Sequence, residues 1–335
     1  MSSPFTRAPS GSRLGVEVCI IGNLTIDVIM RGIEQMPSWG QEVLSTTRSE
    51  SVAGQAGGMA LACVALGVRT DVVADVGDDE AGARIRRELG AAGVGVDAVS
   101  AVPCGTTPLT VAVVRGDGER AFISDLGKLR TVDIADMVRQ RPCVLEASVV
   151  TMAGTSNMPG IDLKSAAAVF AEARRRGALT VFDSGWVADG WSHKAVEGIR
   201  AILAETDVYL PNLEEARALT GRLGVDEVME QLTSLGAGVV IVKGGDIGSY
   251  TVVGGCLVLV KAFSTEVDNA VGAGDVFNAG VVAGYLRGRD VVASMALGTA
   301  AASQYVSRRS NRFPTFDETD ALAQRVSIST VEGRS

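Results

Sequence analysis

Short apolar runs alternate along this chain with longer segments of good helix-forming residues. The strand-like runs are residues 16–21, 71–75, 148–152, 179–182, 208–210 and 239–242. The helix-like segments are residues 56–66, 80–92, 165–176, 194–204 and 213–220. Parallel strands need long crossovers, and strands that are apolar throughout need cover on both faces. The pattern therefore predicts a three-layer α/β/α sandwich around a mainly parallel central sheet.

Two early segments alternate polar and apolar residues instead. They are residues 42–49 and residues 107–124, the second with a turn at Gly116-Asp117-Gly118. A period of two is typical of half-exposed antiparallel strands. Since neither segment can build a core of its own, we expect a small β-sheet lid, inserted at about 36–52 and 104–128 into a single domain of residues 15–326.

Composition narrows the classes of partner. The 335 residues are 47% hydrophobic, enough for a large core, and the net charge is -8. Binding to nucleic acid or to an anionic membrane requires a positive field, so neither is expected. Five widely spaced cysteines and one histidine indicate neither a disulfide framework nor a zinc site. We expect small-molecule chemistry in a reducing compartment.

The chain ends are expected to lie outside the fold. Residues 1–14 are rich in Ser, Pro, Gly and Arg and lack the apolar core of a signal peptide. No run of about 18 apolar residues occurs anywhere in the chain. We expect a cytoplasmic protein with a disordered tail over residues 1–14 and a loose tail over residues 327–335.

A cluster of small residues stands directly before an apolar helix at Gly272-Ala273-Gly274-Asp275. Small residues let a ligand approach the backbone closely, and N–H groups at a helix N-terminus attract anions. Asp275 adds a carboxylate that can accept a proton at the same point. The alternative is a tight turn in which Asp275 only interacts with the helix dipole.

Two common nucleotide motifs are absent from the sequence. The only Gly-Lys pair, Gly127-Lys128, is followed by Leu129 and does not form a P-loop. The first strand leads into Gly22-Asn23-Leu24-Thr25-Ile26-Asp27, which lacks the Rossmann glycine pattern.

That segment and the Gly272–Asp275 motif instead resemble the ribokinase-like (PfkB) carbohydrate kinases, in the same order over most of the chain. The resemblance implies that Asp27 binds substrate hydroxyls; a loop aspartate that caps a turn is the alternative. Residues 53–67 resemble the first glycine signature, with its glycine pair on Ala53 and Gly54. Gly58 then stands where the family has a sugar-binding asparagine, so the identity of the sugar stays open.

Further motifs of the family imply a phosphate and nucleotide site. Asp183 opens a segment that resembles one near the substrate and phosphates. Pro211-Asn212-Leu213-Glu214-Glu215 resembles the Asn-x-x-Glu motif, which implies that Asn212 and Glu215 position Mg2+ through water. A capping box has the same spacing and is the alternative.

The resemblance also implies an ATP site. It would be lined by Lys243, Gly245, Gly248 and Thr299, although a plain hairpin turn also fits the glycines. Thr299 stands where an asparagine is common. In the main motif Asn269 replaces the leading aspartate and Asp268 stands one place early, so dependence on K+ is left open.

The implied activity is ATP-dependent phosphorylation of a hydroxymethyl group on a sugar or related polyol. Asp275 would be the base, and the N–H groups that follow Gly272, those of Ala273, Gly274 and Asp275, would hold the phosphoryl group. A nucleoside or sugar-phosphate kinase and a non-catalytic sensor are the alternatives. The lid would exclude water and join two chains as a homodimer. The basic residues of the second lid segment and beyond are either solvated or bind a substrate phosphate: Arg115, Arg120, Lys128 and Arg130.

Overall fold

The central sheet is parallel throughout its described length. The computed structural model describes residues 3–6, 15–117, 119–139, 141, 145–187, 190–267, 270–308 and 312–331. Seven strands follow the order β11-β10-β9-β8-β1-β4-β5, with every pair parallel. They are β1 (Val18–Gly22), β4 (Thr70–Gly77), β5 (Val99–Val102), β8 (Val149–Ala153), β9 (Leu179–Asp183), β10 (Val208–Tyr209) and β11 (Val239–Val240).

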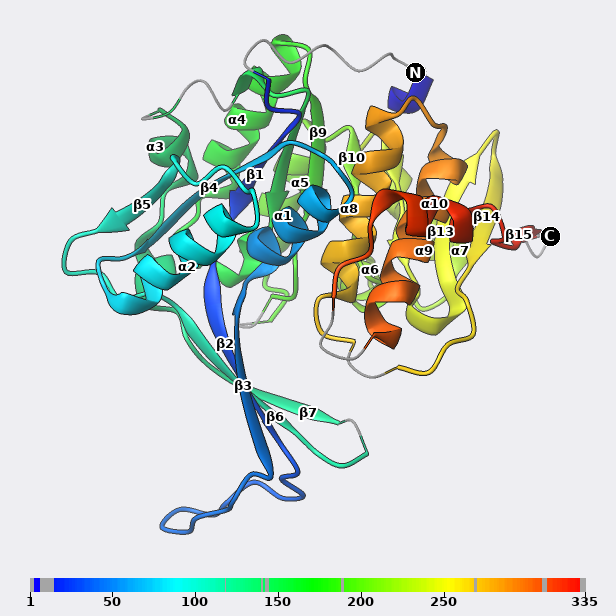
Figure 1. The fold of residues 1–335 in the computed structure, drawn as a ribbon. Coiled ribbons are helices and arrows are strands. Elements are labelled where there is room, and N and C mark those ends of the chain that lie inside the picture. The colour runs from blue at the N-terminus through cyan, green and yellow to red at the C-terminus, as the bar shows by residue number, and fades with distance from the viewer. Residues whose placement is uncertain are drawn as a thin grey trace.

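Helices cover both faces of this sheet (Figure 1). One face carries α1 (Gln55–Ala65), α2 (Glu80–Ala91), α8 (Ala273–Leu286) and α9 (Val291–Ser307), with α10 (Phe316–Ala323) packed on α9. The other carries α3 (Ile134–Arg139), α4 (Leu163–Arg175), α5 (His193–Leu203), α6 (Leu213–Thr220) and α7 (Val225–Ser234). Val18 and Ile20 of β1 belong to the first core, and the intervening Cys19 to the second. The predicted three-layer sandwich is confirmed.

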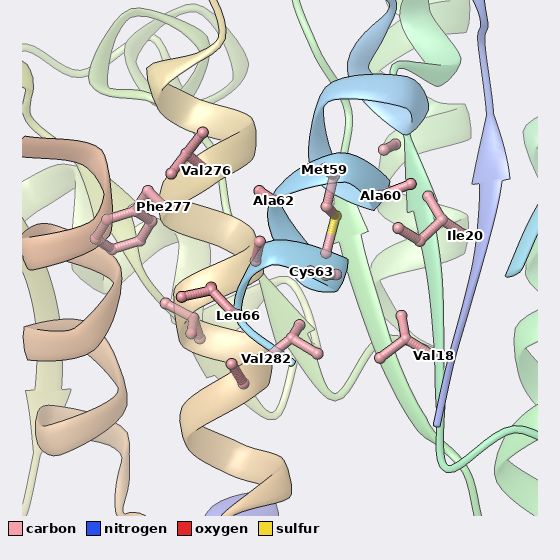
Figure 2. Close-up of a cluster of buried hydrophobic side chains, with 14 of the residues drawn as sticks. Val18, Ile20, Met59, Ala60, Ala62, Cys63, Leu66, Val276, Phe277 and Val282 are labelled. Carbon is pink, nitrogen blue, oxygen red and sulfur yellow. The ribbon is translucent and has the colours of Figure 1, made fainter. Parts of the chain in front are cut away.

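Helix α1 lies between β1 and α8 in the first core (Figure 2). Its Met59 and Cys63 side chains are fully buried. Helices α8 and α9 approach so closely that a Cβ added at Gly280 would lie 2.6 Å from the Cα of Gly298. Backbone cannot move aside cheaply, so this contact requires glycine. The packing fixes the position of α8 and of the residues at its N-terminus.

The lid is a four-stranded sheet of order β3-β2-β6-β7 that projects from the body (Figure 1). Its strands are β2 (Thr25–Arg31), β3 (Thr47–Ala53), β6 (Leu109–Val114) and β7 (Arg120–Asp125). The second and third strands pair in parallel, and the outer pairs are antiparallel. The prediction over 42–49 was wrong in its bounds, and it missed β2. That strand follows β1 after two residues, so the continuous apolar run hides a change of sheet.

A second antiparallel sheet contains strands from the C-terminal half. They are β12 (Val242–Lys243), β13 (Gly248–Val253), β14 (Cys256–Lys261) and β15 (Ile328–Val331). The predicted strand over 239–242 is wrong, because the chain changes sheet at Ile241. The loose tail predicted over 327–335 is also wrong for β15, which pairs with β14; residues 332–335 lie outside the described residues.

The N-terminal segment is likewise only partly as predicted. Phe5 is 8% exposed, and its ring meets the ring of Tyr285 edge-on at 5.7 Å. Disorder is therefore the wrong prediction for residues 3–6, while residues 1–2 and 7–14 lie outside the described residues. Within the described ranges, none of the helices is both long enough and apolar enough to span a bilayer.

Candidate active site

The N-terminus of α8 presents backbone N–H groups beside a carboxylate. Gly272 is the N-cap, and its φ of 82° is left-handed, which favours glycine. The Ala273 N–H donates to the carbonyl oxygen of Ala270 at 3.3 Å. The N–H groups of Gly274 and Asp275 stand in the first turn, where a helix offers no intrahelical acceptor. Two groups, rather than the three predicted, are therefore directed toward an anion.

Asp275 follows at once in an electrostatically strained position. Burial raises the pKa of its carboxyl group well above the usual value, and Asp183 raises it further, whereas Lys243 lowers it. A Cβ added at Gly58 would lie 3.1 Å from Oδ2 of Asp275. The missing side chain at Gly58 therefore leaves open the space directly beside the candidate base.

Two pockets meet at this helix terminus. The smaller, with a volume of about 120 Å³, is lined by Ala273 and Gly274. The larger, of about 1020 Å³, is lined by Gly272 and Asp275. Consecutive residues thus face different pockets, and a group bound at the first turn of α8 touches both.

The smaller pocket contains the four residues predicted to bind nucleotide: Lys243, Gly245, Gly248 and Thr299. Thr299 is 5% exposed, and its hydroxyl has no hydrogen-bond partner among the described residues. A buried hydroxyl without a partner is costly, so a ligand that bonds it is favoured. The hairpin alternative is also met, because the Gly244 N–H donates to the Gly248 oxygen at 2.7 Å.

The larger pocket contains the predicted Asp27, Gly54 and Gly58. Asp27 lies on strand β2 rather than in a loop, and Oδ1 accepts a hydrogen bond from the Thr25 hydroxyl at 2.9 Å. Burial raises the pKa of Asp27, while that hydrogen bond lowers it. A carboxylate in this setting favours donors from a ligand, as a polyol provides.

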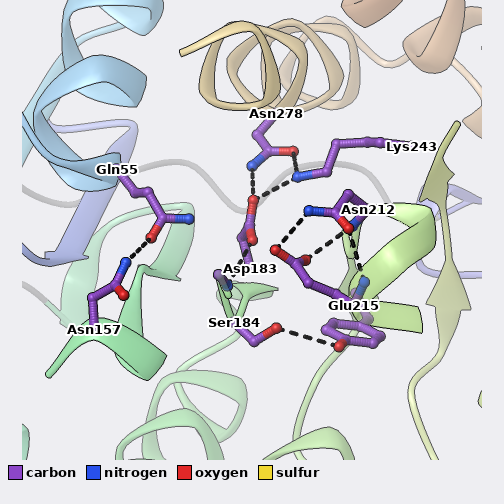
Figure 3. A network of polar contacts seen from close by, with 10 residues as sticks. Gln55, Asn157, Asp183, Ser184, Asn212, Glu215, Lys243 and Asn278 are labelled. Carbon is purple, nitrogen blue, oxygen red and sulfur yellow. Dashed lines mark hydrogen bonds and ion pairs between the residues drawn. The ribbon is translucent and has the colours of Figure 1, made fainter. Parts of the chain in front are cut away.

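Several lining residues escaped the sequence analysis. They include Asn23, Gln55, Phe122, Asn157 and Trp186. Oε1 of Gln55 accepts a hydrogen bond from Nδ2 of Asn157 at 3.4 Å (Figure 3). Gln55 directly follows the glycine pair and could have been noticed for that reason. Asn157 carries no such signal, since it reaches the pocket only through the packing of the loop after β8.

Asp183 lies behind the pockets in a buried network (Figure 3). Its Oδ2 accepts hydrogen bonds from Lys243 Nζ at 2.6 Å and from Asn278 Nδ2 at 2.5 Å. Asp183 is 2% exposed and is not among the described residues that line either pocket, so it positions Lys243 instead of contacting substrate. Asn278 stands three residues after Asp275, a helical spacing that could have revealed it.

Lys243 is surrounded by carboxylates. Burial alone would lower the pKa of its amine, but the charges of Asp183 and Glu215 raise the pKa above its usual value. The ammonium group therefore stays charged at the edge of the smaller pocket, beside Gly274. This position suits binding of a phosphate group.

Asn212 and Glu215 form the capping box of α6. The Glu215 N–H donates to Asn212 Oδ1 at 2.8 Å, and the Asn212 N–H donates to Glu215 Oε2 at 3.0 Å. Burial, with Asp183 adding, raises the pKa of Glu215 to about 7, while Lys243 lowers it. Because both side chains are engaged, they fit a hydrated Mg2+ contacted through water better than direct ligation.

Other metal ligands are not evident in the described part of the chain, where no group of three or more His, Cys, Asp and Glu side chains is clustered. Asp268 and Asn269, on which a K+ site depends, lie outside the described residues.

The sheet order and the helix between two pockets define a ribokinase-like α/β fold. The sequence matches the family model for pfkB family carbohydrate kinases over residues 16–318, and the chain belongs to that family of carbohydrate kinases.

Individual relatives agree with this assignment. The chain is 28% identical to an ATP-dependent ribose-1-phosphate kinase of Halopiger xanaduensis, over 92% of this chain and 98% of the relative. It is 26% identical to a 5-dehydro-2-deoxygluconokinase of Geobacillus thermodenitrificans, over 95% and 96%. A solved Arabidopsis thaliana ribokinase, complexed with ribose and ATP, has the same fold, with a TM-score of 0.78, 22% identity and coverage of 92% and 99%.

The Lys243 network yields a stability prediction. Lys243→Met removes the cation and leaves the Asp183 carboxylate buried, so we expect the free energy of unfolding to fall by about 3–5 kcal/mol. Denaturant titration measures this change. The double variant Asp183→Asn/Lys243→Met should be more stable than Lys243→Met alone, because the unpaired charge is gone. If the double variant is the less stable of the two, the buried pair does not govern the stability of this site.

Proposed function

We propose that this kinase transfers the γ-phosphoryl group of ATP to a hydroxymethyl group of a sugar or related polyol. One observation carries the proposal: a single helix terminus separates the two pockets, with two N–H groups and a carboxylate between them. The smaller pocket would bind ATP and the larger the acceptor. In-line transfer requires this juxtaposition of donor, acceptor and base.

Charge governs the proposed mechanism. The N–H groups of Gly274 and Asp275 would stabilise the transferring phosphoryl group, and Lys243 would contact a phosphate oxygen. Asp275 would accept the hydroxyl proton, for which its raised pKa makes it a stronger base than an ordinary aspartate. Mg2+, held through water by Asn212 and Glu215, would supply positive charge to the phosphates.

The acceptor side supports a sugar-derived substrate. Asp27 would bind hydroxyl groups, and the amides of Gln55 and Asn157 would add donors and acceptors. The names of both reported relatives specify a sugar-derived acceptor, and the first specifies ATP. The lid strand that carries Asp27 would close over the sugar and exclude water as a competing nucleophile.

The proposed base is tested by Asp275→Asn. Turnover should fall by about 10²- to 10⁴-fold, while ATP still binds, because the amide cannot accept the proton. The folded-state pKa of Asp275 is raised, so ionisation of this group destabilises the fold at pH values above that pKa. The variant should therefore show a higher melting temperature at neutral pH. Coupled ADP release and thermal unfolding are the measurements.

The matched control is Asp317→Asn. Asp317 occupies the first turn of α10 and is exposed, away from both pockets. It should change neither turnover nor melting temperature appreciably. Wild-type turnover in Asp275→Asn would rule out this residue as the base.

The pH dependence follows from the same pKa shift. Since Asp275 must be ionised to act, kcat/KM should fall as pH is lowered, with a midpoint well above 3.8. Glu215 raises the pKa of Asp275, so Glu215→Gln should move the midpoint of the remaining activity to lower pH. A profile that stays flat down to about pH 4, or a shift to higher pH, would contradict the assignment.

We also infer that two chains associate through their lids. Strand register places Val28, Val111 and Ile123 in one row on the lid face opposite Asp27. Ile123 is 57% exposed, and exposed apolar side chains recur on the lid and its connecting loop at Met36, Trp39, Val43, Leu44 and Leu109. A contiguous apolar surface of this kind is typical of an interface.

Sedimentation velocity tests this association. Wild-type protein should sediment as a two-chain species, and Ile123→Glu should weaken association by about tenfold or more, since it buries an unpaired charge. Leu223→Glu is the control, because Leu223 is 78% exposed and lies between α6 and α7. A monomeric wild type would refute the inferred dimer.

A further inference from the structure

The lid face that looks into the larger pocket is graded in charge along its strands. The first cross-strand row contains Asp27, Ser51, Thr110 and Ser124. The next row on that face contains Ile29, Ser49, Ala112 and Phe122, and the third contains Arg31, Thr47, Val114 and Arg120. Over four residues of β2 the surface therefore changes from acidic through apolar to basic.

Arg31 is an uncommitted cation in this pocket. It lines the larger pocket together with Asp27 and Ile29, as the alternation of β2 requires. The glutamates of the same pocket already have a counter-ion, since Arg84 binds Glu88 at 2.6 Å and Glu50 at 3.0 Å. Within the described ranges, by contrast, neither Arg31 nor Arg120 forms an ion pair.

The distances indicate a ligand longer than a bare pentose. Arg31 stands four residues beyond Asp27, which is about 13 Å along a strand, and its long side chain can shorten that span. The pocket volume of about 1020 Å³ lies at the upper end of the usual range for small-molecule sites. A simple sugar at Asp275 would leave the basic end of the pocket empty.

Charge sets the direction in which such a ligand binds. An anionic group near Asp27 and Asp275 would be repelled by two carboxylates. The same group at Arg31 would meet a guanidinium whose planar donors match phosphate or carboxylate. An anionic sugar would therefore bind with its neutral hydroxymethyl end toward Asp275.

We infer that the acceptor carries an anionic group, phosphate or carboxylate, at the end remote from the hydroxyl that is phosphorylated, and that Arg31 binds this group with Arg120 beside it. This inference rests on the proposed function, in which the larger pocket binds the acceptor. It assigns the discrimination between charged and neutral sugars to one row of the lid.

Matched acceptors test the inference. The panel compares ribose with ribose 1-phosphate and fructose with fructose 1-phosphate, and 2-keto-3-deoxygluconate is the carboxylate arm. An anionic acceptor should exceed its neutral counterpart, or ribose in the carboxylate arm, at least about tenfold in kcat/KM. Arg31→Gln should reduce this ratio by about 10- to 100-fold, mainly through KM. The arm that responds identifies phosphate or carboxylate.

Arg48→Gln is the matched control. Arg48 pairs with Met30 on the opposite lid face, forms an ion pair with Glu50 at 3.5 Å and does not line the pocket. It should leave the ratio unchanged. Equal use of neutral and anionic acceptors, or an equal loss for both in Arg31→Gln, would overturn the inference while leaving the kinase reaction intact.

Calorimetry without ATP separates the inference from the proposed function. If no acceptor is phosphorylated, the proposed function fails, but tighter binding of the anionic member, lost in Arg31→Gln, would still support the anion site. Equal binding of both members, or binding of neither, would overturn it.

Discussion

The burial of helix α8 is the constraint on which the active site depends. Ten consecutive residues of this helix, from Val276 to Tyr285, are buried between α1 and α9. A helix held on all sides cannot shift to relieve strain at its N-terminus. The left-handed Gly272 and the carboxylate of Asp275 are therefore held where the two pockets meet, and the core supports an arrangement that would be unfavourable alone.

The electrostatics of the site show the same balance. Asp275 experiences the charges of Asp27, Asp183 and Glu215, and Lys243 opposes them. Like charges at short range raise carboxylate pKa values, which is costly for the fold and useful for a base. A bound nucleotide would add further negative charge, so cations must accompany it. This need explains why Asp183 and Asn278 hold Lys243 beside the phosphate end of the smaller pocket.

The sequence predicted the sandwich because strands buried on both faces leave a direct apolar signal. It placed Lys243 and Thr299 in one pocket and Asp27 and Asp275 in the other through motifs at strand and helix ends. It missed β2 and the split at Ile241, because an apolar run does not record a change of sheet. It also missed β15, whose pairing with β14 depends on a contact between distant segments. Asn157 and Arg31 reach the site only through tertiary packing and strand register, which local pattern does not encode.

The claim that both pockets meet at α8 is tested most directly by a bisubstrate ligand, in which adenosine is joined through a polyphosphate chain to the hydroxymethyl group of an accepted sugar. If the N-terminus of α8 separates donor from acceptor, inhibition will be competitive against both ATP and the sugar, with affinity above that for either alone. Competition against ATP only, with affinity no higher than that for ATP, would contradict the account.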